Sequence, residues 1–141
     1  PCDAFTREQV EYALGDDAPE GERDDFVTGP GCKWRDSVSG ATVWASYSTK
    51  TREGLSSFYQ NAQPRAQVWR ELSPIGGFPA IAYQAHKGGT SCSVVIGVAD
   101  DFAVTAAGAP SRARYGKTDP CEMAQDMAEL LVGNLKERAG R

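Results

Sequence analysis

The sequence has few of the residues on which enzymes most often depend. Its only histidine is His86, so a serine or thiol nucleophile would have a single imidazole available as its base. No serine lies in a G-x-S-x-G motif, and His86 precedes Lys87-Gly88-Gly89, which is typical of an exposed turn. We therefore expect a solvated side chain at His86, no cofactor and no enzymatic activity.

Long apolar runs are also absent. The longest, Ser93–Ala99 and Leu130–Val132, are far shorter than the roughly 20 residues of a membrane-spanning helix. With 40% hydrophobic and 24% charged residues, the 141-residue chain has the composition of one globular domain, residues 1–141. The net charge of −4 and the lack of a broad basic stripe argue against binding to nucleic acid. We expect a monomer.

Closely spaced cysteines are missing as well. Cys2, Cys32, Cys92 and Cys121 form no C-x-x-C pair, the spacing that zinc sites usually use, and we predict no metal site. An even number of widely spaced cysteines favours two disulfides made in an oxidising compartment. Three connectivities are possible. We favour the local pairs Cys2–Cys32 and Cys92–Cys121, each closing a loop of about 30 residues and stabilising the fold by about 3.6 kcal/mol.

The segment Asp16–Gly31 is rich in carboxylates and has little to bury, so we expect a mobile polar loop. An EF-hand count fails, because Ala18 and Val27 stand where ligands are needed. A weak, irregular calcium site is the alternative to a solvated loop. The carboxylates are those of Asp16, Asp17, Glu20, Glu22, Asp24 and Asp25.

Three helices are predicted. Thr6 and Gln9 form a capping box that begins a helix of about eight residues, and Gly15 ends it. Apolar residues at helical spacing predict a second helix over Arg52–Ala62. A D-x-x-E box with proline at the first helical position begins the third helix at residue 120.

Strand patterns predict a sheet of about six strands, with a turn region over Ser73–Pro79. The last four strands follow one another as a meander, so the sheet should be mostly antiparallel. Together with the three helices this is an α+β fold. The predicted strands are Cys32–Asp36, Ala41–Thr49, Gln67–Leu72, Ala80–His86, Ser91–Ala99 and Phe102–Ala107.

Taken in order, six segments resemble an actinobacterial family of secreted lipoproteins, Domain of Unknown Function 3558. This resemblance implies an export segment and a lipidated cysteine upstream of Pro1 that tethers the domain to the membrane. It implies no established activity and no catalytic residues. The layout is similar to the α/β sandwiches of the photosystem-subunit-P and Mog1-like group, a likeness of fold only. The segments are Pro1–Thr6, Val10–Gly15, Gly31–Trp34, Gly77–Ala80, Cys92–Val98 and Asp119–Ala124.

Two aromatic residues and one basic loop are candidates for a binding surface. Trp44 falls on the polar-looking face of its strand, and Trp69 alternates out of phase with Val68, Arg70 and Leu72. Both tryptophans are core if helices cover that face, which we favour, and a recognition surface if they are exposed. The loop Pro110–Lys117 could meet an anionic headgroup or a phosphorylated polymer, or could be ordinary soluble surface. Its candidate residues are Arg112, Arg114, Tyr115 and Lys117.

These observations predict a non-enzymatic domain on the outer face of the cell membrane, lipid-anchored or secreted. We expect its partner to be another envelope protein or a small amphiphilic ligand. Two alternatives remain: an enzyme that acts on wall or lipid components through carboxylates, and a purely structural adaptor.

Overall fold

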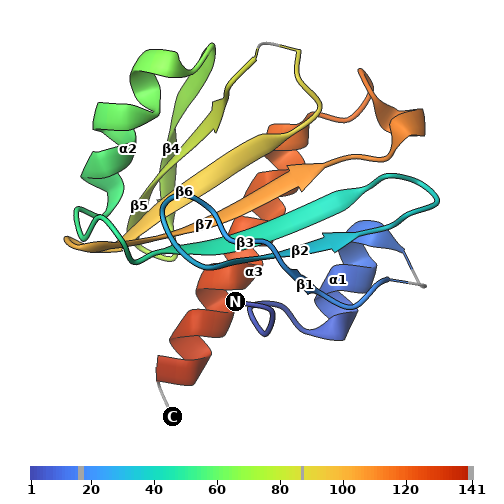
Figure 1. Ribbon diagram of the computed structural model, residues 1–141, viewed down its shortest axis with the longest axis horizontal. Coiled ribbons are helices and arrows are strands. Elements are labelled where there is room, and N and C mark those ends of the chain that lie inside the picture. The colour runs from blue at the N-terminus through green and yellow to red at the C-terminus, as the bar shows by residue number, and fades with distance from the viewer. Residues whose placement is uncertain (16–17, 87, 140–141) are drawn as a thin grey trace.

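A computed structural model describes residues 1–15, 18–86 and 88–139. An antiparallel sheet with the strand order β1-β2-β3-β7-β6-β5-β4 forms its centre, with α1 and α3 on one face and α2 on the other (Figure 1). The predicted α+β class is correct, and the sheet has seven strands. The elements are α1 (Arg7–Leu14), β1 (Glu22–Arg23), β2 (Gly31–Arg35), β3 (Thr42–Ser48), α2 (Leu55–Asn61), the 3-10 helix η1 (Gln63–Arg65), β4 (Val68–Ile75), β5 (Phe78–Gln84), β6 (Cys92–Ala99), β7 (Phe102–Ala109), the 3-10 helix η2 (Arg112–Arg114) and α3 (Pro120–Ala139).

The main core lies between the sheet and the long helix α3. Met127 and Leu131 of α3 are buried together with Ala106 of β7. A Cβ at Gly108 would lie 3.0 Å from Cγ of Met123. Helix and strand therefore pack closely where β7 has small groups on this face, at Ala106 and Gly108.

The short helix α1 is held at its N-terminus and along its side. Thr6 Oγ1 accepts a hydrogen bond from Gln9 N at 3.2 Å, and Gln9 Oε1 accepts one from Thr6 N at 2.9 Å, which is the predicted capping box. Asn134 of α3 donates to Gln9 Oε1 at 2.7 Å and to the Ala4 carbonyl at 2.8 Å. These side-chain bonds connect α1 to α3 where both lie on the same sheet face.

Both predicted disulfides are present. Cys2–Cys32 joins the N-terminal segment to β2, with Cα atoms 5.1 Å apart. Cys92–Cys121 joins β6 to the first turn of α3, with Cα atoms 4.9 Å apart. The two covalent links therefore secure the α1–α3 layer to the sheet, one toward each end of the chain.

The acidic segment is paired with the sheet from Glu22 on, and the prediction of an unpaired polar loop is wrong for residues 22–31. Asp24 N donates to the Gly31 carbonyl at 3.0 Å, and Phe26 and Gly29 exchange two backbone bonds of 2.9 and 3.2 Å. This makes β1 and β2 a hairpin with its tip at residues 26–29, and β1 becomes the seventh strand. The backbone pairs while most of the carboxylates stay in solvent; Asp16 and Asp17 lie outside the described residues.

The turn between β4 and β5 is shorter than predicted. It consists of Gly76 and Gly77, with φ of 60° and 88°, a conformation that glycine adopts without a steric cost. β4 continues to Ile75 through a register shift that begins at Leu72. Pro74 is tolerated there because β4 is an edge strand with a bulge.

Helix α2 begins at Leu55 rather than at the predicted Arg52. Arg52 and Gly54 have φ of 55° and 59°, and a right-handed helix cannot include left-handed residues. The chain between β3 and α2 is therefore a strained connection rather than a first helical turn.

Removing the Cys92–Cys121 disulfide should destabilise the fold by about 3 to 4 kcal/mol, since the cross-link restricts the unfolded chain. The double variant Cys92→Ala/Cys121→Ala tests this by urea denaturation. A change of less than about 1 kcal/mol would show that this link is dispensable.

The variant Gly29→Ala should destabilise the fold by about 2 kcal/mol or more, because overpacking displaces backbone. A Cβ there would lie 1.9 Å from the Tyr47 carbonyl oxygen, so the hairpin would have to separate from β3. Gly133→Ala is the matched control: nothing lies within 4 Å of a Cβ on this exposed residue of α3. The control should be neutral or stabilising by up to about 1 kcal/mol. Equal effects in urea denaturation would contradict the packing of the hairpin.

Candidate functional site

The sheet face opposite α3 is covered only in part. Helix α2 packs on it through Phe58, which forms a small buried cluster with Ile81, Val95 and Ala103. From the other side, the tip of the β1–β2 hairpin reaches over the same face (Figure 1). A hollow remains between the helix and the hairpin.

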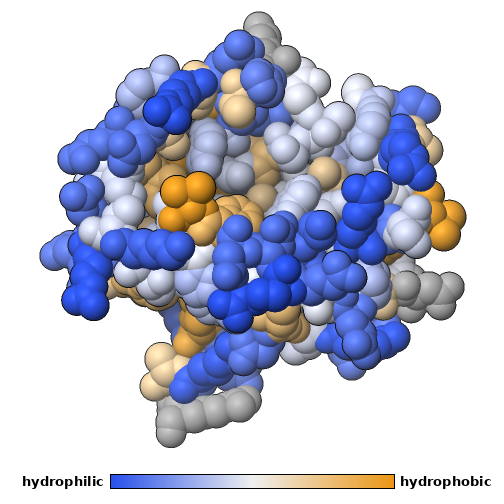
Figure 2. All heavy atoms as spheres, in the orientation of Figure 1, coloured by the Kyte–Doolittle hydropathy of each residue, from blue (hydrophilic) through white to orange (hydrophobic). Residues whose placement is uncertain are grey.

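We call this hollow the α2 groove. It has two connected parts, with volumes of about 460 and 430 Å³, and both are lined by Val27, Thr28, Phe58 and Tyr83. Figure 2 shows this face of the molecule hollowed, with apolar side chains exposed in the depression. The first part is completed by Thr51, Ser57, Asn61, Ala62, Arg65, Ala66 and Ala85, and the second by Asp24, Asp25, Phe26 and Thr105.

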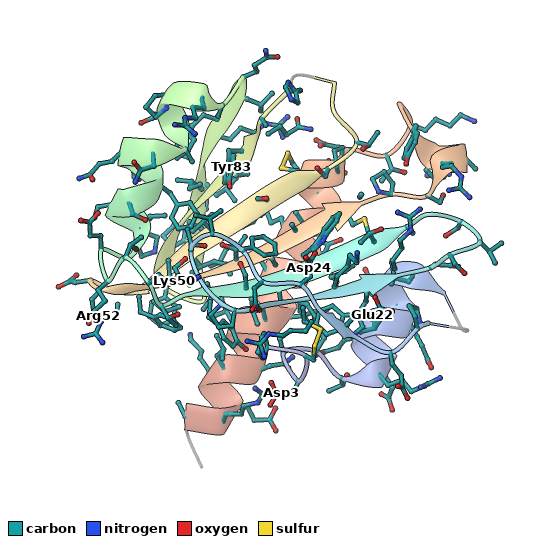
Figure 3. The ribbon with its side chains drawn as sticks, viewed as in Figure 1. Asp3, Glu22, Asp24, Lys50, Arg52 and Tyr83 are labelled. Atoms are coloured by element: carbon teal, nitrogen blue, oxygen red, sulfur yellow. A yellow bond between two sulfur atoms is a disulfide. The ribbon has the colours of Figure 1, made fainter. Side chains whose placement is uncertain are left out.

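Aromatic rings form the floor and one wall of the groove. Tyr83 of β5 lies between α2 and the hairpin (Figure 3). Its ring stacks on Trp69 of β4 with centroids 5.9 Å apart, and Tyr59 of α2 contacts Trp69 edge-on at 5.1 Å. Phe58 lies 6.5 Å from Tyr83. These contacts fix the floor against α2, since offset and edge-to-face pairs are the favoured aromatic geometries.

Burial changes the pKa of a titratable side chain in the floor, the phenol of Tyr83. It raises the pKa of the Tyr83 phenol above its ordinary value, and a hydrogen bond with Ser93 lowers that pKa in part. Tyr83 therefore stays neutral well into the alkaline range. The floor of the groove presents a neutral aromatic surface at physiological pH.

The polar groups on the α2 side of the groove are bonded within the helix. Ser57 Oγ donates to the Gly54 carbonyl at 3.2 Å. Asn61 Nδ2 donates to the Ser57 carbonyl at 2.9 Å. With these donors engaged, this wall offers a ligand mainly apolar contact.

The charged residues each line only one of the two parts of the groove, and the four residues that line both parts are uncharged. Arg65 of η1 lines the first part, and no described residue forms an ion pair or hydrogen bond with its guanidinium. Asp24 and Asp25 line the second part. Asp25 accepts a hydrogen bond from Arg23 Nε at 2.6 Å, and this bond, with one from Gly31 N, lowers the pKa of its carboxyl. Asp25 is therefore already paired.

The two tryptophans proposed from the sequence do not form one surface. They are the second and last members of a row of cross-strand neighbours, Lys33, Trp44, Ala107, Ser93, Tyr83 and Trp69. Four strand spacings separate Trp44 from Trp69, roughly 19 Å. Both are half-buried. Trp69 supports the floor of the groove from behind Tyr83, while Trp44 does not line it.

The basic loop lies elsewhere. Arg112 donates to the Val38 carbonyl at 2.7 Å, so it holds the turn between β2 and β3. Arg114 donates to Thr118 Oγ1 at 2.9 Å and lines a separate cleft of about 570 Å³ that includes α1 and α3 residues. Tyr115 and Lys117 are exposed. This cleft and the α2 groove share no lining residue.

Sequence reasoning missed three residues that define the groove: Val27, Phe58 and Tyr83. Val27 is 94% exposed within an acidic segment, an unusual place for an apolar side chain and the one signal that could have been noticed. The sequence predicts Phe58 only as an apolar residue of a helix and Tyr83 only as a residue of a strand. Val27 reaches these two residues only through the hairpin, which the sequence did not predict.

Among the residues that the structure describes, no group of three or more His, Cys, Asp or Glu side chains is placed to hold a metal ion. None of the described helices has the length and apolar character to span a membrane. His86 is exposed, as expected from the turn that follows it.

The stability of the fold should fall at alkaline pH partly through Tyr83. Its folded-state pKa is raised, so its contribution is fully present below the unfolded value of about 10 and is lost as the pH rises through the folded value. Tyr83→Phe should therefore lose less stability than the wild type between pH of about 9 and about 11. Urea denaturation across this range measures the difference, and Tyr115→Phe controls for the loss of one phenol. Parallel pH profiles for wild type and Tyr83→Phe would contradict the burial of this hydroxyl.

Comparison with known proteins gives a family but no characterised relative. No curated protein and no solved structure matches the chain, so the likeness to the photosystem-subunit-P and Mog1-like group stays a prediction. A family model, described as a protein of unknown function (DUF3558), matches residues 1–134. The match includes every strand and both walls of the groove. The chain therefore belongs to the DUF3558 family.

Proposed function

We propose that this domain is a non-enzymatic binding module that holds a small amphiphilic ligand in the α2 groove. The observation that carries the proposal is the groove itself, an apolar, aromatic-floored hollow of about 460 Å³ in its larger part. Sites for small ligands are concave, mostly apolar and about 300 to 1,000 Å³ in volume. A protein partner would more often use a flat apolar patch.

The polar chemistry of the groove supports binding rather than catalysis. A general base or nucleophile needs a partner within hydrogen-bond reach. His86 is not among the lining residues. Asp25 is held ionised by Arg23, which makes it a poor proton donor.

The separate cleft that contains Arg114 is lined by carboxylates, those of Asp36, Glu122 and Asp126. Asp36, one of its acidic residues, accepts bonds from Val38 N at 2.9 Å and from Ser39 Oγ at 3.0 Å. These bonds lower the pKa of the Asp36 carboxyl. Asp36 thus stabilises the β2–β3 turn, and its role there favours structure over acid catalysis.

We place this binding module on the extracytoplasmic side of the cell envelope. Two disulfides support this, since they persist in oxidising compartments. Anchoring would be through a lipidated cysteine upstream of Pro1, and the domain would present the groove to ligands outside the membrane.

Binding can be tested with the fluorescent apolar probe N-phenylnaphthylamine, whose emission rises in an apolar site. The wild type should show a saturable rise. Val27→Asp should weaken binding roughly tenfold, because it replaces an apolar wall by a charge. Val27 is 94% exposed, so the substitution leaves the core intact.

The matched control is Val38→Asp, which makes the same change at a valine that is 84% exposed on the turn between β2 and β3. It should bind the probe like the wild type. If the wild type shows no saturable signal, or if both variants lose it equally, the groove is not the binding site.

A further inference from the structure

We infer that the ligand has a single apolar chain and an anionic head group, and that the guanidinium of Arg65 binds the head. This inference rests on the proposed binding function and adds the chemical class and orientation of the ligand. Three features of the groove support this inference. They are its elongated shape, its uncharged middle and the different charges at its two ends.

The groove is elongated and has a neutral middle. Its two parts meet at Val27, Thr28, Phe58 and Tyr83, which line both. The rings and the valine are apolar, and Tyr83 is neutral at physiological pH because burial raises its pKa. An apolar chain gains favourable contact along such a surface. A polar ligand would lose its hydration there without compensating bonds.

Arg65 supplies an uncommitted cation at one part of the groove. It lies in η1, directly after α2, and none of the described residues neutralises it. Guanidinium groups bind carboxylates and phosphates through paired, charge-assisted hydrogen bonds. An anionic head at this position completes a pair that the protein leaves open.

The other part of the groove disfavours an anion. Asp24 and Asp25 line it, and the cations Arg23 and Lys50 both lower the pKa of Asp25. Figure 3 shows Asp24 and Lys50 on this side of the molecule. A second anion there would meet two carboxylates, while Arg23 is already bonded to Asp25 and Lys50 is not among the lining residues. The ligand is therefore oriented, with its head at Arg65 and its chain running toward the hairpin tip.

The head could be a carboxylate, as in a fatty acid, or a phosphate, as in a single-chain phospholipid. Both match the guanidinium, so both belong to the proposed class. Dodecanoate, dodecyl phosphate and dodecanol carry the same chain and differ in the head alone. They therefore separate the contribution of the head from that of the chain.

The experiment is displacement of N-phenylnaphthylamine from the folded domain by each of the three compounds, below their micelle concentrations. Both anions should displace the probe at lower concentrations than dodecanol does. Arg65→Gln should weaken the tighter anion about fivefold, the effect of an exposed ion pair, and leave dodecanol unchanged. The advantage of that anion should also shrink as salt is added to the wild type, but not to the variant.

Arg7→Gln is the control for loss of one positive charge. Arg7 is an exposed residue of α1, on the opposite side of the sheet, and its partner is Glu11 at 3.1 Å. It should leave all three affinities unchanged. Thermal denaturation of both variants checks that they remain folded.

The outcomes separate the inference from the proposed function. If all three compounds compete equally and Arg65→Gln has no effect, the groove binds apolar chains and the assignment of the head is wrong. If nothing displaces the probe, or the probe does not bind, the binding function itself fails. A preference for either anion that disappears in Arg65→Gln supports the inference, and the tighter anion identifies the head.

Discussion

The central strand of the sheet, β7, carries almost only small side chains, and the packing on both faces depends on this. On one face, Ala106 and Gly108 allow α3 to approach closely and bury its apolar stripe. On the other face, Ala103, Thr105 and Ala107 leave room above the sheet. The long helix fills the space on its side. The seven residues of α2 cannot do so on theirs, and the groove is the remaining volume.

The hairpin gives this remaining volume its second wall. Without β1 and the tip around Val27, the second face would be a shallow surface beside α2. The tip stays in place because the backbone of residues 28–30 continues along β3, where Tyr47 N donates to the Pro30 carbonyl at 3.0 Å and Thr49 N to the Thr28 carbonyl at 3.1 Å. Gly29 permits this approach, since any side chain would meet the Tyr47 carbonyl. Backbone pairing at a sheet edge thus positions a wall that has few side-chain contacts of its own.

Elements with strong local signals could be predicted from the sequence, and elements defined by distant pairing could not. Thr6 with Gln9, and the proline at residue 120, mark helix starts through local hydrogen bonds and fixed φ. β1 has two residues and no apolar alternation, so only its partner β2 reveals it. The same holds for the candidate site, whose residues come together through distant pairing. Trp69 was a candidate from the sequence, but its relation to Tyr83 and Val27 depends on strand order and on the hairpin.

The two layers are held with very different strength. The α1–α3 layer is cross-linked twice to the sheet, whereas α2 has no side-chain cap at its start and rests on one small apolar cluster. Local opening requires least free energy where few buried contacts must be broken. Helix α2 should therefore exchange its amide hydrogens far faster than α3, through excursions that leave the rest of the domain folded. Such excursions would widen the groove, because α2 forms one of its walls.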